Sequence, residues 1–369
     1  MKRFILFLLF LTLLAPALPV AAATNTSTFH KLTAHGWLPY WVKDTGTDEA
    51  RDHLSTLSSV SAFAYEVDAK GRLIDRVRLK QSPWPDFISD AQDADTDIYA
   101  TIAWHNGEQI HDVLSSASKR RKHIANIAKV ATSKIDGIDI DYESKLAETN
   151  PYFSTFLSEL NKALDKKHKE LICTIEARTP LEDRVARVTP EILAQQAYAN
   201  DYRAINESCD VIRIMAYDQG RIDLKLNAAA NAAGSYYSPI ADPQWVRKVV
   251  QLALKDFSPD KVQLGIPTYG RVYKVTGGTY EYMRSLSYDD AIALAKTNNV
   301  SFTRNRSGEM SFMYTTSSTG EKGNYVAFFN DAQAIADKVA VAREFKLDGV
   351  VFWRIDGQSD PEMWNVFIK

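Results

Sequence analysis

Cysteine is scarce in this chain, which has only Cys173 and Cys209 among its 369 residues. No CxxC or HExxH motif is present, and the seven histidines are scattered. Structural and catalytic zinc sites draw their ligands from such clusters, so neither is expected here. We also expect no cofactor.

Long apolar runs are equally few. One run, residues 4–14, follows Lys2 and Arg3 and precedes the small-residue stretch at residues 21–23. This order is typical of a secretory signal peptide. The alternative, a membrane anchor, needs about 20 unbroken apolar residues, whereas prolines interrupt this run early. We therefore expect a signal peptide at residues 1–23, cleavage near Ala23, and a secreted or periplasmic mature chain with no stable membrane insertion.

A strong excess of positive charge is also absent. Removing residues 1–23 leaves 42 Lys plus Arg against 46 Asp plus Glu, a net charge of −4. This mild acidity argues against nucleic acid as a partner. The short basic run at residues 119–122 favours a solvated helix face. We expect a monomer, although the sequence does not fix the oligomeric state.

The richest stretch in chemical terms is DGIDIDYE at residues 136–143. Side chains alternate along a strand, so Asp139, Asp141 and Glu143 share one face and apolar residues share the other. The Asp141 and Glu143 side chains start roughly 6.6 Å apart, close enough for each carboxylate to shift the other's proton affinity. We expect Asp139 to share a proton with Asp141, leaving Glu143 as the group most readily kept neutral. A solvent-facing edge strand and a hard-metal site are the alternatives.

The spacing D-x-x-D-x-D-x-E after an apolar run resembles the signature of glycoside hydrolase family 18, the chitinase family. The resemblance implies a TIM (β/α)8 barrel with this motif on its fourth strand. It also implies that Glu143 is the general acid and that Asp141 orients the substrate's acetamido group. Residues 215–218 and 265–271 look like two further family motifs, and Trp353 corresponds to the tryptophan under the cleavage subsite.

Strand-like and helix-like runs alternate along the chain, as in a parallel α/β fold. Helices are expected near residues 153–164 and at residues 190–205, the second opened by Thr189. Residues 272–328 break the alternation and predict a small α+β insertion between the seventh strand and its helix, within a catalytic barrel of residues 24–369. Eight strand-like runs occur in order, as a closed barrel requires: residues 36–41, 60–66, 97–104, 136–143, 171–177, 210–217, 262–266 and 349–354.

Candidate site residues gather at the C-terminal ends of these runs, where the active site of such a barrel lies. Aromatic faces stack on sugar rings, so clustered aromatics at this end favour a carbohydrate site. The catalytic candidates are Asp139, Asp141, Glu143, Tyr217 and Asp218. The substrate-binding candidates are Tyr40, Trp41, Tyr65, Trp104, Met215, Tyr269, Arg271 and Trp353.

The resemblance further implies a retaining, substrate-assisted hydrolysis of β-linked N-acetylglucosamine glycans. The substrate's own acetamido oxygen attacks while Glu143 protonates the leaving oxygen. Asp141 holds the acetamido N–H, Tyr217 donates to its oxygen, and Asp139 and Asp218 tune the charge of the pair. The alternative is a catalytically weak or inactive glycan-binding lectin on the same barrel, which the presence of Glu143 disfavours.

The substrate stays open between chitin-type oligosaccharides and peptidoglycan. The third strand-like run ends Ala103-Trp104-His105-Asn106, where many chitinases have a Ser-x-Gly-Gly turn. Other phrases look closer to the bacterial branch that includes spore-cortex and peptidoglycan glucosaminidases, but the LysM repeats usual there are missing. Neither endo versus exo cleavage nor the host follows from the sequence.

The two cysteines lie in or beside neighbouring strand-like runs. An export compartment would permit a bridge between them, but Cys is also a common small core residue. The sequence leaves the disulfide open.

Overall fold

The computed structural model describes residues 32–220, 223–316 and 322–367. The predicted signal peptide, residues 1–23, and its cleavage position lie outside these residues. Within the described ranges, no helix combines the length and apolarity needed to cross a bilayer.

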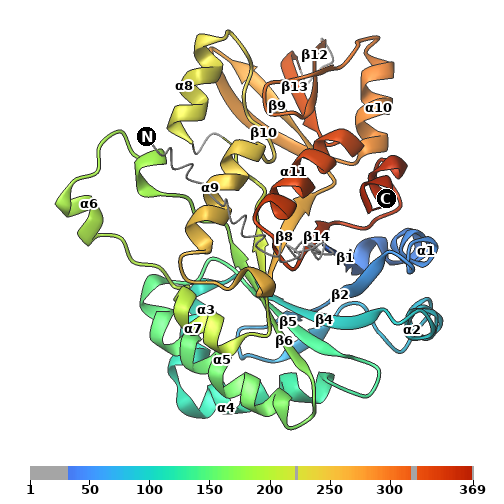
Figure 1. The fold of residues 1–369 in the computed structure, drawn as a ribbon, viewed down its shortest axis with the longest axis vertical. Helices are drawn as coiled ribbons and strands as arrows, with labels where there is room; N and C mark the ends of the chain where they lie inside the picture. Colours follow the sequence, from blue (N-terminus) through green and yellow to red (C-terminus); the bar gives the residue numbers. More distant parts are fainter. Residues whose placement is uncertain (1–31, 221–222, 317–321, 368–369) are drawn as a thin grey trace, which may run out of the picture. The chain divides into compact units, whose positions relative to one another are not determined.

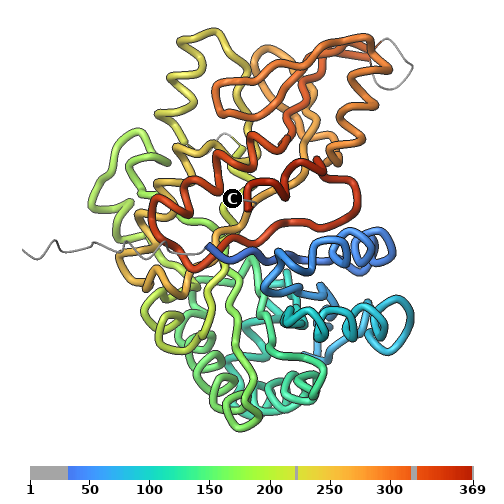
Figure 2. The backbone as a smooth tube through the Cα atoms, turned by 45° about the vertical axis from the view of Figure 1, so that its right-hand side comes forward, coloured from blue at the N-terminus to red at the C-terminus, as the bar shows by residue number. Residues whose placement is uncertain are grey.

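Eight parallel strands form a closed barrel, which confirms the TIM-barrel prediction. Their order is β1-β14-β8-β7-β6-β5-β4-β2, and β1 pairs with both β14 and β2, so the sheet has no break (Figures 1 and 2). A ninth strand, β3 (Leu73–Asp75), runs antiparallel to the end of β2. The barrel strands are β1 (Thr33–Pro39), β2 (Leu57–Val67), β4 (Asp97–Trp104), β5 (Gly137–Tyr142), β6 (Glu170–Glu176), β7 (Val211–Met215), β8 (Val262–Pro267) and β14 (Gly349–Trp353).

Helices surround this barrel. Four of them, α3, α8, α9 and α11, follow an Asn or Asp whose side chain accepts a hydrogen bond from a first-turn N–H. Figure 1 shows α3, α4, α5 and α7 beside β5 and β6. The helices outside the second sheet are α1 (Lys43–Asp52), α2 (Trp84–Asp93), α3 (Gly107–Ser115), α4 (Ala117–Val130), α5 (Asn150–Asp165), α6 (Pro190–Ala194), α7 (Tyr202–Ser208), α8 (Leu224–Ala232), α9 (Pro243–Ala253) and α11 (Ala332–Glu344).

The single helix predicted at residues 190–205 is wrong. Thr189 caps α6 as expected, but α6 ends at Ala194. A second helix, α7, begins after Asp201, whose carboxylate accepts hydrogen bonds from the N–H groups of Arg203 and Ala204. A new cap inside the predicted helix starts a new helix, because the capping residue itself has extended backbone geometry.

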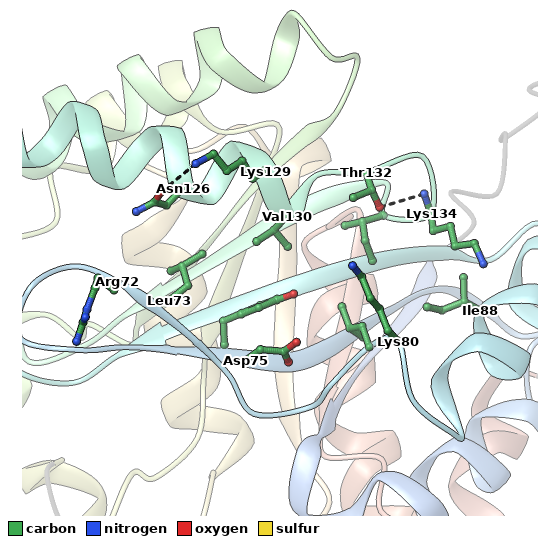
Figure 3. A pocket seen from close by; sticks show the side chains of 13 residues that line it. Arg72, Leu73, Asp75, Lys80, Ile88, Asn126, Lys129, Val130, Thr132 and Lys134 are labelled. Atoms are coloured by element: carbon green, nitrogen blue, oxygen red, sulfur yellow. Dashed lines mark hydrogen bonds between the residues drawn. The ribbon is translucent and has the colours of Figure 1, made fainter.

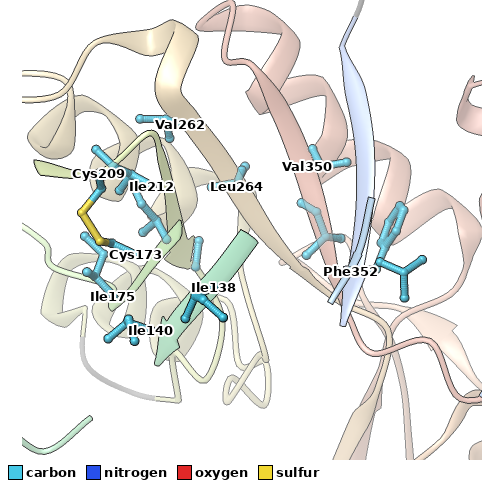
Figure 4. Packing of buried hydrophobic residues seen from close by; sticks show 14 of the residues in the cluster. Ile138, Ile140, Cys173, Ile175, Cys209, Ile212, Val262, Leu264, Val350 and Phe352 are labelled. Atoms are coloured by element: carbon cyan, nitrogen blue, oxygen red, sulfur yellow. A yellow bond between two sulfur atoms is a disulfide. The ribbon is translucent and has the colours of Figure 1, made fainter. Parts of the chain in front are cut away.

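The main apolar core lies between the strands and the helices (Figure 4). Ile138, Ile140 and Tyr142 of β5 all face this layer, as the alternation predicted. Cys173 and Cys209 also lie here and form a disulfide, which answers the question that the sequence left open. The barrel interior, in contrast, holds charged side chains.

A second sheet lies between β8 and α11 in the chain. Its five antiparallel strands run in the order β10-β9-β13-β12-β11, and α10 (Tyr288–Thr297) packs with them around a separate apolar cluster. The capping box of Ser287 and Asp290 starts α10 at Tyr288. The domain boundaries 272–328 stay a prediction. The strands are β9 (Gly270–Thr276), β10 (Thr279–Leu286), β11 (Thr303–Arg304), β12 (Met310–Thr316) and β13 (Gly323–Phe329).

Candidate active site

Asp139, Asp141 and Glu143 form what we call the acidic wall. Asp139, the first of them along the chain, lies inside the barrel with its side chain fully buried. Trp37 Nε1 and Thr101 Oγ1 each donate to its Oδ2 at 2.8 Å, and Thr174 Oγ1 donates to its Oδ1 at 2.6 Å. Arg213 Nη1 lies 3.2 Å from Oδ2. One guanidinium and three neutral donors around a carboxylate suit an anion. Arg213 and the three neutral donors surround the Asp139 carboxylate, and the proton shared between Asp139 and Asp141 stays a prediction.

Arg213 was not anticipated from the sequence. Its guanidinium donates to Gln263 Oε1 at 2.9 Å and to Ser59 Oγ at 3.3 Å, and it lies 5.2 Å from the ring centre of Trp37. It alternates with Ile212 and Ile214, which face the outer core. A charged residue between two apolar neighbours on a buried strand was the signal available for an interior cation.

Asp141, two residues further along β5, is 4% exposed. Burial, then the charges of Glu143 and Asp139, raise the pKa of Asp141 well above its usual range. Its Oδ1 has no hydrogen-bond partner among the described residues. The Asp141 carboxyl therefore holds a proton readily and keeps one acceptor available to a ligand.

Glu143 stands where β5 ends, and its backbone N–H donates to Trp104 O at 2.8 Å. Its carboxylate Oε1 lies 3.3 Å from His105 Nδ1, on the segment that follows β4. The hydrogen bond to Glu143 is the largest cause that raises the pKa of His105. Both side chains are partly exposed, so a ligand can reach them. The turn sequence had marked His105 only as a departure from chitinases, not as a partner of the acid.

A buried cation, Lys145, also lies close to Asp141 and Glu143. The Lys145 ammonium is almost completely buried, donates to Tyr142 O, and lies 3.5 Å from Glu176 Oε2. Its burial lowers its own pKa, while its charge lowers the pKa of Asp141 against the larger effects of burial and like charge. The positive charge of Lys145 therefore favours the ionised form of Asp141 and partly offsets the effect of burial.

Tyr217 and Tyr269 form the opposite side of the site, with ring centres 6.3 Å apart in an edge-to-face arrangement. The Tyr269 hydroxyl donates to Asp218, whose Oδ1 also lies 2.6 Å from an Arg271 nitrogen. Burial is the largest cause that raises the pKa of Tyr217 well above its usual range, followed by Tyr269 and the charge of Asp141. Tyr217 therefore remains a hydrogen-bond donor. Met215, the last residue of β7, is half-buried.

Gly265 on β8 makes room for this arrangement. A Cβ there would lie 2.9 Å from Cε1 of Tyr217 and 2.6 Å from the carbonyl oxygen of Ile214. A side chain at residue 265 would therefore displace the Tyr217 ring.

An aromatic floor closes the barrel mouth around Trp353. Its ring centre lies 5.2 Å from Phe63, 5.9 Å from Trp37 and 6.4 Å from Trp41, all edge-to-face. Trp41 is 49% exposed and offers a ring to solvent. Tyr40 packs against Trp41 rather than extending the floor. Phe63 was not anticipated from the sequence.

A family model described as Glycosyl hydrolases family 18 matches residues 39–358. The chain belongs to glycosyl hydrolase family 18. This membership makes it a glycoside hydrolase.

Two of the curated relatives of this family-18 chain come from Bacillus subtilis. An uncharacterized glycosylase, YvbX, is 21% identical and the match covers 85% of this chain and 84% of the relative. The cortical fragment-lytic enzyme is 24% identical over 85% of this chain and 68% of the relative.

Solved structures share the barrel. The spore cortex-lytic enzyme SleL of Bacillus cereus superposes with a TM-score of 0.71 at 20% identity, over 91% of this chain and 74% of that one. A chitinase from Chromobacterium violaceum gives a TM-score of 0.72 at 20% identity, over 91% and 98%.

Two predicted substrate-binding residues of this family-18 barrel do not face its mouth. Trp104 is 2% exposed and packs on Tyr142 and His123 in the outer layer, because it shares the strand face of Ile102. Tyr65 lines a hollow on the outer wall. A β-bulge between Phe63 and Tyr65 inverts the alternation of β2, so Tyr65 pairs with the outward residue Ile102.

The remaining predicted residues of the family-18 site do gather at the mouth. Asp141 of β5 and Glu143 just after it lie near Tyr217, which follows β7. Tyr217 contacts Tyr269, which follows β8, and Arg271 of β9 lies over the Tyr269 ring. Tyr217 and Trp353 of β14 pack against the same small apolar cluster. Within the described residues, no group of three or more His, Cys, Asp or Glu side chains could hold a metal ion.

Proposed function

We propose that this family-18 enzyme is a secreted, retaining glycosidase that hydrolyses β-linked N-acetylglucosamine glycans with Glu143 as general acid. The observation that carries the proposal is the environment of Asp141. Its carboxyl is buried beside Glu143, tends to hold a proton and has an oxygen without a partner in the described part of the chain. A substrate amide N–H would satisfy that oxygen.

The proposed first step needs four side chains in contact with the sugar. The Trp353 face seats the ring at the cleavage position, and Glu143 gives its proton to the glycosidic oxygen as the bond to the anomeric carbon breaks. The substrate's acetamido oxygen bonds to the same carbon and forms an oxazolinium. Asp141 accepts from the acetamido N–H, while Tyr217 donates to the acetamido oxygen before attack.

In the second step the Glu143 carboxylate takes a proton from water, which attacks the anomeric carbon and opens the oxazolinium ring. Two inversions at one carbon give net retention. Asp139, held by Arg213, and Asp218, held by Tyr269 and Arg271, set the charge around the reacting pair.

Substrate assistance is favoured because the carboxylates share one strand. A double-displacement enzyme places its nucleophile about 5–5.5 Å from the acid across the scissile bond, and family 18 is a substrate-assisted exception. Asp141 lies on the same strand face as Glu143, so it is poorly placed to attack the opposite face of the sugar. The carboxylate of Asp218 already accepts a hydrogen bond from Tyr269 and forms an ion pair with Arg271.

Two glycans meet the requirements of this mechanism, chitin-type oligosaccharides and peptidoglycan. Relatives point in both directions, since one is a cortical fragment-lytic enzyme and one solved neighbour is a plant chitinase in complex with (GlcNAc)3. Both polymers carry the N-acetyl group that the mechanism requires. We propose a location outside the cytoplasm because residues 1–23 have the pattern of a secretory signal peptide.

The deciding experiment measures product release from N-acetylglucosamine oligomers and from purified peptidoglycan, for the wild type and for Glu143→Gln. We expect the wild type to cleave one of them, with retained anomeric configuration, and the variant to lose at least ~100-fold in rate. Glu143→Gln keeps the size of the side chain, and thermal unfolding would verify its fold. Binding of both glycans without cleavage would overturn the proposal in favour of a lectin.

A further inference from the structure

A groove runs along the outer wall of the barrel between α4 and the hairpin of β2 and β3. It consists of two hollows, of about 620 and 190 Å³, that are adjacent because Arg72 and Asn126 line both of them. Figure 3 shows the larger one, with Lys129 and Val130 of α4 on one side and Leu73 and Asp75 on the other. The larger hollow is within the size range of ligand sites.

Lysine dominates the lining of this groove. On α4, Lys119, Lys122, Asn126 and Lys129 recur at intervals of three and four residues, so they form one stripe about 15 Å long. Two acids, Asp75 and Asp112, line the same hollows, and Lys119 already pairs with Asp112 at 2.7 Å. The six exposed lysines of the groove are Lys70, Lys80, Lys119, Lys122, Lys129 and Lys134.

This stripe refines the interpretation of the basic run at residues 119–122 as a solvated helix face. Arg120 turns inward, is 8% exposed and donates to Glu159 at 2.9 Å. Lys119 and Lys122 instead line the smaller hollow. The run therefore supplies a largely buried arginine that pairs with Glu159, an exposed pair between Lys119 and Asp112, and part of the lysine-lined groove.

We propose that this groove binds a linear polyanion, a phosphodiester chain without bases such as poly(glycerol phosphate). A row of charges matches a polymer with repeating charge better than a single small anion. The protein as a whole is slightly acidic, so the positive field is a local property of this groove.

The residue types favour phosphodiester over the other polyanions. Carboxylates are matched best by the planar fork of Arg, whereas Lys binds phosphate as a point charge. The single arginine of the lining, Arg72, already pairs with Asp68 at 2.6 Å. Single-stranded nucleic acid needs aromatic stacking platforms, and the one aromatic side chain that lines the larger hollow is Tyr65. Leu73, Val130 and Ile135 give the floor an apolar character that suits an alkyl backbone.

The test measures binding of synthetic poly(glycerol phosphate) to the purified protein at 50 and 200 mM NaCl. The groove variant is Lys122→Glu with Lys129→Glu. Its matched control is Lys255→Glu with Lys296→Glu, which changes the net charge equally at exposed positions outside the groove. Hydrolysis of soluble substrate and thermal unfolding, measured on all three proteins, report the catalytic site and the fold separately.

We expect wild type and control to bind alike and the groove variant to lose ~10-fold or more at low salt. The slope of log K against log salt should fall by about 0.7 for each lysine–phosphate ion pair that the substitutions remove. Equal binding by the groove variant and its control would overturn the proposal, as would no binding by wild type. Tighter binding of single-stranded DNA than of poly(glycerol phosphate) would also overturn it, because the partner would then be a nucleic acid. None of these outcomes depends on whether the enzyme cleaves N-acetylated glycans.

Discussion

Arg213 and Asp139 form an ion pair in the middle of the barrel, with 3.2 Å between Nη1 and Oδ2 and both side chains fully buried. The interior of a TIM barrel is usually filled by layers of branched apolar side chains. Here the Asp139 carboxylate of this ion pair lies two residues before Asp141 on the same strand face. Its negative charge is one cause of the raised pKa of Asp141.

Removing one partner of this pair should be costly. We expect Arg213→Met to destabilise the fold by about 3–5 kcal/mol, because Asp139 would keep a buried charge without its counterion. Asp139→Asn combined with Arg213→Met should be less destabilising than the sum of the single changes. Urea denaturation measures all three. The control, Arg247→Met, removes a partly exposed pair with Glu344 and should cost less than about 1 kcal/mol. Strict additivity of the buried changes would contradict this account.

The contact between His105 and Glu143 predicts a pH effect. The carboxylate stabilises the imidazolium, so the pKa of His105 is raised. The attraction is therefore complete below the usual pKa of about 6.5 and is lost as pH rises through the raised value. We expect Glu143→Gln to lower the pKa of His105, as measured by NMR titration of the imidazole. The other histidine resonances serve as the control, and an unchanged His105 titration would refute the contact.

Trp353 and Trp104 should respond oppositely to substitution by alanine. Trp353 faces the mouth, so its loss should lower kcat/KM on oligosaccharides by tenfold or more, which is about 1.4 kcal/mol. Trp104 is buried in the outer layer, so its loss should destabilise the fold by about 3–5 kcal/mol. Kinetics and urea denaturation on both variants separate the two effects. Equal kinetic losses at equal stability would mean that Trp104 also contacts substrate.

The disulfide between Cys173 and Cys209 closes a loop with a sequence separation of 36 residues. A loop of this length corresponds to about 3.8 kcal/mol in the chain-entropy model, and typical measured values are about 2–4 kcal/mol. We expect Cys173→Ala with Cys209→Ala to lower the free energy of unfolding by about that amount. The kcat of the folded variant should equal that of wild type, because the bridge lies in the outer core. A large loss of kcat without a loss of stability would argue otherwise.

The acidic wall was predictable from sequence because it depends only on the alternation of one regular strand. Trp104 was misplaced for the opposite reason, since its position at a strand end was given more weight than the strand face it occupies. Tyr65 was misplaced because the bulge in β2 changes the face, and neither the bulge nor the helix break before α7 has a strong sequence pattern. Arg213 and His105 act through residues far away in the chain, so only the closed barrel reveals their partners.

The bulge at Ala64 also decides which surface each aromatic side chain of β2 serves. Phe63 contributes to the aromatic floor of the barrel mouth, while Tyr65, displaced by one extra residue, contributes to the lysine-lined groove outside. Loss of Ala64 would restore strict alternation and leave Tyr65 on the outer face, because Tyr65 would then follow the inward-facing Phe63 directly. The bulge therefore allows two aromatic side chains that are two positions apart in the chain to serve opposite surfaces of the barrel.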